Sequence, residues 1–98
     1  MNDRSRGFAD DTELAEVASM GVCINLHAGQ PLLAAALQPV ARAAWDRVAG
    51  GGGPDALLRE ARRARRDLRL AVGAETERRF LESVIAHARG RKIAGDRG

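Results

Sequence analysis

Four side chains that could bind a metal or react as a nucleophile recur at helical spacing near the start of the chain. Glu16, Met20, Cys23 and His27 follow the spacing i, i+4, i+7, i+11, which places them on one strip of a helix. A Cys and a His four residues apart can share a zinc or copper ion, and a Cys beside a His can become an activated thiolate.

Neither chemistry finds support elsewhere in the sequence. A zinc site uses three or four protein ligands, and the remaining candidates, His87 and the acidic residues, have no signature spacing. A thiol nucleophile also needs an oxyanion donor and a pocket, which no motif indicates. We interpret the strip as a packing or half-exposed face, with Cys23 as a small apolar residue. We predict no catalytic residue, metal or cofactor, and therefore no enzyme.

The stretch from Pro54 to Val72 carries six of the sixteen basic residues. On a helix its apolar residues line one side, and four arginines project from roughly the opposite side: Arg59, Arg62, Arg63 and Arg66. Such a face can contact nucleic-acid phosphates or an acidic protein. Asp55, Glu60 and Asp67 lie on or near it and weaken the nucleic-acid interpretation. The four glycines before Pro54 form no P-loop, because no Lys-Ser or Lys-Thr follows them.

Charge is divided unequally between the two halves of the chain. Residues 1–49 hold four basic and six acidic side chains, a net of −2, and residues 50–98 hold twelve basic and seven acidic, a net of +5. The asymmetry predicts that the C-terminal half meets an acidic partner or the N-terminal half of another copy, unless its charged face is simply solvated.

The elements that must carry these residues are predicted to be all-α. Helical periodicity with proline starts and glycine stops gives two hairpins, residues 10–49 and 54–90, joined by a glycine hinge at 50–53. The second hairpin divides at Gly73 into a helix over 54–72 and a helix ending at Gly90. Together the hairpins form one domain over 10–90, arranged as a four-helix bundle or an intertwined dimer.

Three regions of this scheme are less regular. Residues 1–9 are predicted to be a disordered arm that Phe8 could pin down, and residues 91–98 a disordered basic tail. Pro39 leaves open whether residues 31–49 form one kinked helix or two.

The core is predicted to be thin, because the chain has 19 alanines and few aromatic residues. A thin core favours an interface with another protein or with a second copy. We place that interface on the uncharged stretch 17–41, with its stripe of Leu33, Leu37 and Val40, and on Trp45, which flanks that stripe. An amphipathic indole beside such a stripe is as consistent with an interface anchor as with a core residue.

These patterns predict a small non-catalytic helical protein-interaction module or accessory subunit. The alternative is a nucleic-acid-binding regulator that uses the arginines of 54–72. The single cysteine and the polar first sixteen residues favour the cytoplasm. The apolar runs are shorter than the roughly 20 residues that a bilayer requires, so no membrane partner is expected. No small-molecule substrate is inferred.

Overall fold

The computed structural model describes residues 7–97, which form four helices and no strand, as the sequence predicts. Their bounds are α1 Asp11–His27, α2 Pro31–Val48, α3 Pro54–Asp67 and α4 Glu75–Arg97. The predicted disordered arm falls mostly on residues 1–6, which lie outside the described residues.

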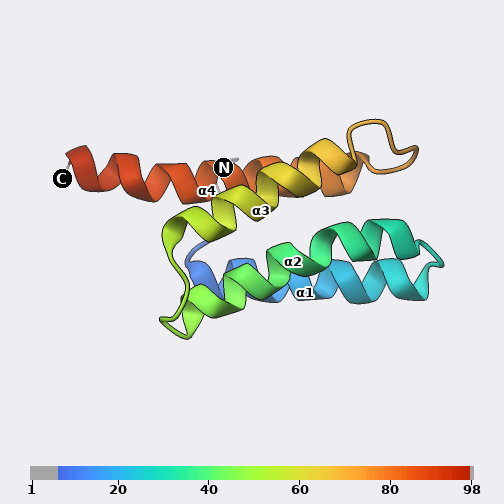
Figure 1. Cartoon of the computed structure of the whole chain (residues 1–98), viewed down its shortest axis with the longest axis horizontal. Helices are drawn as coiled ribbons and strands as arrows, with labels where there is room; N and C mark the ends of the chain where they lie inside the picture. Colours follow the sequence, from blue (N-terminus) through green and yellow to red (C-terminus); the bar gives the residue numbers. More distant parts are fainter. Residues whose placement is uncertain (1–6, 98) are drawn as a thin grey trace.

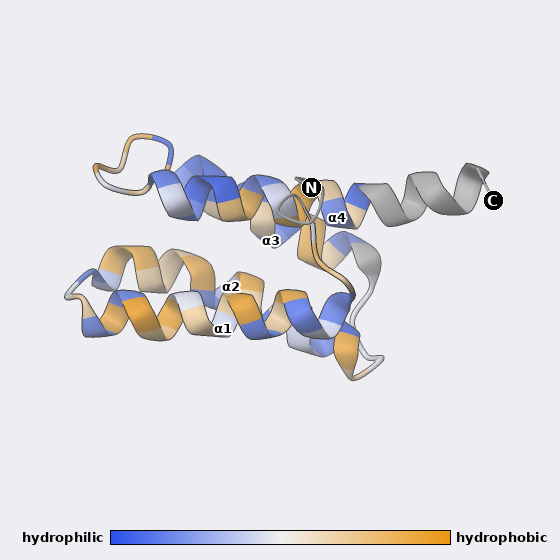
Figure 2. Cartoon of the chain, turned by 180° about the vertical axis from the view of Figure 1, so that it is seen from behind, coloured by the Kyte–Doolittle hydropathy of each residue, from blue (hydrophilic) through white to orange (hydrophobic). Residues whose placement is uncertain are grey.

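The helices pair as two hairpins that stack on one another. α1 packs against α2, α3 packs against α4, and α2 also contacts α3 (Figure 1). The α1–α2 loop and the α3–α4 loop lie at the same end of the molecule, which we call the loop end, and the glycine-rich α2–α3 connection lies at the other end (Figure 1). Figure 2 shows the same arrangement from behind.

The core lies between the two layers and is rich in alanine. Of the 19 hydrophobic residues buried in the described part of the chain, 10 are alanines. The largest fully buried side chains come from all four helices: Leu14, Leu37, Val40, Leu57, Leu81 and Val84. Burying a leucine contributes about 1.5–3 kcal/mol, whereas an alanine buries far less apolar surface. The fold is therefore held by a few large aliphatic side chains set among many small ones.

Local signals explain where α1 and α2 begin and end. The Asp10 side chain caps α1 by accepting from the Glu13 N–H at 2.9 Å. Gly29 has φ +74°, the left-handed conformation that glycine adopts without a steric cost, and it ends α1 as predicted. Pro31 opens α2, and Pro39 lies inside a single helix rather than between two.

The hinge between the hairpins, Gly50–Gly53, wraps the end of α2. The N–H groups of Gly51 and Gly52 both donate to the carbonyl of Asp46, at 2.9 and 3.1 Å. A Cβ on Gly52 would lie 2.9 Å from the Asp46 Cβ, which is too close for any side chain. The hinge therefore needs glycine at position 52, where it passes close to α2.

The predicted helix over 54–72 is too long, since α3 ends at Asp67. The Arg78 guanidinium of α4 donates to the carbonyls of Leu68 at 2.9 Å and Ala71 at 3.1 Å, which stabilises a turn in place of further helix. Gly73, with φ +78°, completes the reversal. Val72, which the sequence places at the margin of the buried side, is 95% exposed in the structure.

The last helix differs from the prediction at its C-terminal end. α4 continues through Gly90 to Arg97, so Gly90 does not end it. A single glycine costs a helix about 1 kcal/mol, and the neighbouring arginine, lysine and alanine residues have high helical propensity. The tail predicted as disordered over 91–98 is thus helical as far as Arg97.

A buried polar cluster joins α1, α2 and α4 near the hinge. His87 Nε2–H donates to Asp11 Oδ1 at 2.9 Å, and Arg47 Nε lies 3.5 Å from Asp11 Oδ2. Phe8 packs edge-on against the rings of Phe80 and His87, with centroids 5.9 and 5.8 Å away. Phe8 therefore fixes the chain just before α1, and His87 is a half-buried structural residue.

Candidate functional site

An apolar groove lies between α1 and the start of α4. Its volume is about 210 Å³. The walls come from two helices: Val17, Met20 and Ile24 of α1, and Thr76, Glu77 and Phe80 of α4. A cavity of about 150 Å³ lined by aliphatic and aromatic side chains can hold benzene, so this groove can hold a large apolar side chain.

The floor of the groove depends on a glycine. A Cβ on Gly21 would lie 3.1 Å from Leu37 Cδ1, closer than ordinary van der Waals contact. Because Gly21 has no side chain, Leu37 of α2 packs closely against α1 at this position and lines the groove together with residues of α1 and α4. Gly21 thus permits the close approach of α2 to α1.

Asn25 joins the two walls of the groove. It is 5% exposed, and its Nδ2 donates to the Gly21 carbonyl at 2.8 Å and to Glu77 Oε2 at 3.0 Å. A buried side-chain amide needs a hydrogen-bond partner, and for Asn25 that partner is Glu77, 52 residues away in the chain. The bond sets the spacing of α1 and α4 and therefore the width of the groove.

Exposed apolar side chains surround the loop end. Met20 and Ile24 on α1 are 56% and 60% exposed, and Leu70 and Val72 in the α3–α4 loop are 86% and 95% exposed. The stretch 17–41, which supplies α1 and the start of α2, contains no charged side chain. Figure 2 shows the hydrophobic colouring of α1 and α2 continuing to this end. An uncharged, apolar surface that solvent reaches is typical of a docking site.

The predicted interface residues lie in two places. Leu33, Leu37 and Val40 are 5%, 1% and 0% exposed and belong to the core, because their stripe faces the other helices of the same chain. Trp45 is 40% exposed, and its Nε1–H donates to Ser19 Oγ at 2.8 Å. Of the four, only Trp45 can contact a partner of the folded chain with a large part of its side chain.

The strip of Glu16, Met20, Cys23 and His27 runs along the outer side of α1, and all four side chains are exposed. His27 Nδ1–H donates to the Cys23 backbone carbonyl at 3.2 Å, so this nitrogen is not free to bind a metal. Among the side chains that the structure describes, no group of three or more His, Cys, Asp or Glu is placed to hold a metal.

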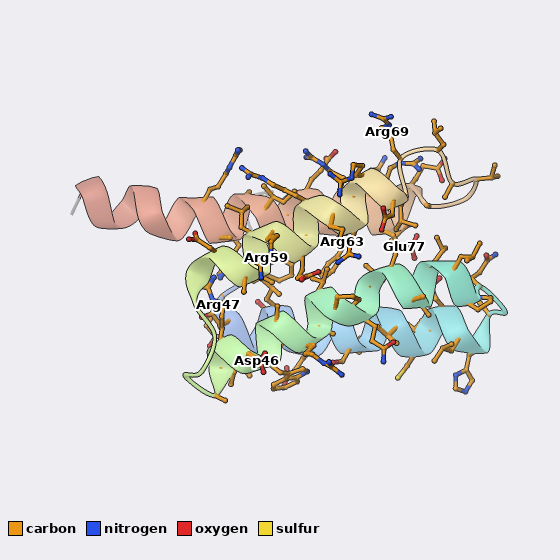
Figure 3. The ribbon with its side chains drawn as sticks, in the orientation of Figure 1. Asp46, Arg47, Arg59, Arg63, Arg69 and Glu77 are labelled. Carbon is orange, nitrogen blue, oxygen red and sulfur yellow. The ribbon has the colours of Figure 1, made fainter. Side chains whose placement is uncertain are left out.

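The arginines predicted to form a basic face do so. Arg59, Arg62, Arg63 and Arg66 are all exposed along α3 and line a shallow depression with Asp55 and Leu58. Figure 3 shows Arg59 and Arg63 on the side of α3 nearer to α2. Arg63 lies 4.0 Å from Glu60 Oε1, and among described residues no carboxylate lies within 4 Å of Arg59, Arg62 or Arg66. The face keeps its positive charge available to a polyanion.

Sequence reasoning missed the α4 wall of the groove and the exposed α3–α4 loop. The helix predicted over 54–72 includes Leu70 and Val72, which the structure places in that loop. One signal indicates the loop: Val72 directly precedes Gly73 and Leu70 lies three residues before it, where a turn exposes side chains.

No protein-family model matches the chain, and no curated protein or solved structure matches it significantly. Among the described residues, no helix combines the length and apolarity needed to cross a bilayer. The α1–α4 groove and the arginine face of α3 are therefore the features from which a function can be inferred.

Proposed function

We propose that this chain is a small, non-catalytic helical protein-interaction module or accessory subunit of the cytoplasm, and that its docking surface is the α1–α4 groove with Leu70 and Val72 of the α3–α4 loop. The observation that carries the proposal is the groove itself: Met20 and Ile24 remain exposed beside a hollow that Phe80 and Leu37 line. Apolar hollows of this kind bind the hydrophobic face of a partner.

The energetics support the same proposal. A core in which alanine predominates gives a small domain little margin of stability. Full burial of an exposed Met or Ile side chain contributes about 1.5–3 kcal/mol, and Met20 and Ile24, which are 56% and 60% exposed, would gain roughly half of that each against a partner. Docking would then stabilise the fold of the module as well as the complex.

The test compares two lysine substitutions on α1. Ile24→Lys places a charge at the edge of the groove, whereas Leu26→Lys changes a side chain of similar exposure, 57%, that does not line it. We expect proteins captured from the native cells by the wild type to be retained by Leu26→Lys and lost with Ile24→Lys. Equal capture by both variants would contradict a docking role for the groove.

The second candidate function is nucleic-acid binding through α3. It is favoured by the arginines at positions 59, 62 and 66, which are exposed and lie beyond 4 Å of any described carboxylate. Four phosphate contacts would give a slope of roughly −3 to −4 in log K against log salt on duplex DNA.

A pair of double variants tests this second function. Arg62→Glu with Arg66→Glu would abolish DNA binding if the α3 face contacts the phosphates. Arg79→Glu with Arg89→Glu makes the same change in net charge at exposed positions of α4 and serves as the control. Equal loss of DNA binding by both double variants would show only a response to net charge. If the wild type does not bind DNA even at low salt, nucleic-acid binding is excluded as a function of α3.

A further inference from the structure

We propose that the occupant of the groove is a second copy of this chain, which inserts the α3–α4 loop, residues 69–73, with Leu70 and Val72 as the inserted side chains. The inference rests on the proposed function, because it names the partner of the same surface. The two copies exchange loops reciprocally about a two-fold axis, so that each loop fills the groove of the other copy.

Shape is the first argument for this occupant. Two copies that met groove against groove would leave both hollows unfilled, since a concave surface needs a protrusion. Among the large hydrophobic residues of the described chain, Val72 and Leu70 are the most exposed, at 95% and 86%. They stand on a turn that reverses the chain between α3 and α4, and their apolar side chains match a groove of about 210 Å³.

The loop is also held in a form suited to insertion. Arg78 donates to the carbonyls of Leu68 and Ala71, so the backbone on either side of Leu70 is bonded to α4. Gly73 fixes the reversal with φ +78°. An apolar protrusion that is already ordered loses less conformational entropy on binding than a flexible one.

Charge supplies the third argument. Arg69 adjoins Leu70 and projects away from the helices at the loop end (Figure 3). The groove has carboxylates beside it: Glu77 on the α4 wall, and Glu16 on α1 one turn before Met20. A loop that carries a cation next to its apolar residues, and a groove that carries anions next to its own, are complementary between copies.

Position makes the exchange possible. The α3–α4 loop lies at the loop end, and the groove is lined by the start of α4, which follows that loop directly, whereas the hinge lies at the other end (Figure 1). A two-fold axis passing beside the loop end therefore brings both complementary pairs together at once. The start of α3, which follows the hinge, is left outside this interface.

The test measures molar mass by light scattering and sedimentation over a wide range of concentration. We expect the wild type to dimerise. The loop variant Leu70→Asp with Val72→Asp, and the groove variant Ile24→Lys, should each weaken dimerisation roughly 100-fold or more, because symmetry removes every contact twice. Both sites are exposed, so circular dichroism should show unchanged helicity. Leu26→Lys should dimerise like the wild type.

Mixing the two variants distinguishes loop exchange from other dimers. A heterodimer keeps one native loop in one native groove, and in the second contact the introduced carboxylates meet the introduced ammonium group. The mixture should therefore dimerise more tightly than either variant alone. A mixture that stays as weak as its components, or a dimer that survives both variants, would overturn the inference.

The same samples separate this inference from the proposed function. If the wild type is a monomer at every concentration, the second copy is not the occupant and the inference fails. The proposed function survives that result only if the wild type captures another protein from the cells, and if Ile24→Lys loses that protein whereas Leu26→Lys retains it.

Discussion

The hydrogen bond between Asn25 and Glu77 provides the sharpest test of how the groove is built. Asn25→Ala removes an amide that is 5% exposed and donates at 3.0 Å to the Glu77 carboxylate. A hydrogen bond to a charged group contributes about 1.5–3 kcal/mol, and the half-buried position of Glu77 allows water to replace part of it. We therefore expect a coupling of about 1–2 kcal/mol between the two side chains.

A double-mutant cycle measures that coupling directly. Urea unfolding followed by circular dichroism gives the free energy of unfolding for the wild type, Asn25→Ala, Glu77→Ala and the double variant. Each single change should lower the thermal midpoint by several degrees in a domain of this size. Glu82→Ala, at an exposed position of the same helix, is the control and should stay within about 0.5 kcal/mol of the wild type. Single effects that add without coupling would refute the assigned bond.

Three further substitutions test the loop, the groove floor and the buried cluster. Arg78→Met should destabilise the fold by about 1–3 kcal/mol and speed amide exchange at residues 69–73, because the carbonyls of Leu68 and Ala71 lose their donor; unchanged exchange would contradict this. Gly21→Val should cost about 1–3 kcal/mol in urea unfolding, since its side chain would overlap Leu37, and a gain in stability would argue against the close approach. His87→Ala should cost about 2 kcal/mol or more by the same measurement, because it removes the donor to Asp11 and the ring that packs on Phe8; a change below 0.5 kcal/mol would show that the cluster is not structural.

The helices could be predicted from sequence wherever the signal is local. Gly29, Pro31, Gly53 and Pro54 mark boundaries through their own backbone preferences, and the structure places helix ends at them. The end of α3 could not be predicted in this way, because Arg78 supplies the donors from a helix later in the chain. Local propensity across residues 68–72 gave no sign of that interaction.

The surfaces were harder to predict than the helices. A periodic apolar stripe such as Leu33, Leu37 and Val40 has the same pattern whether it faces the core or a partner, and here it faces the core. The groove needs α1 and α4, which are far apart in sequence, so no spacing could indicate it. The arginine face of α3 was predictable, because outward residues on an amphipathic helix follow from the position of the buried ones.

The most direct test of the docking surface is a paramagnetic relaxation measurement between copies. Cys23 is the only cysteine, and it is exposed on α1 one residue before Ile24, so a nitroxide attached there lies beside the groove. The spin-labelled protein is mixed with isotope-labelled Cys23→Ser protein that carries no nitroxide. We predict that the Leu70 and Val72 methyl signals of the isotope-labelled copy broaden, while signals from the hinge, Gly50–Gly53, at the other end of the molecule do not. Broadening confined to α3, or none at concentrations where light scattering shows a dimer, would contradict the assignment of the groove as the docking surface.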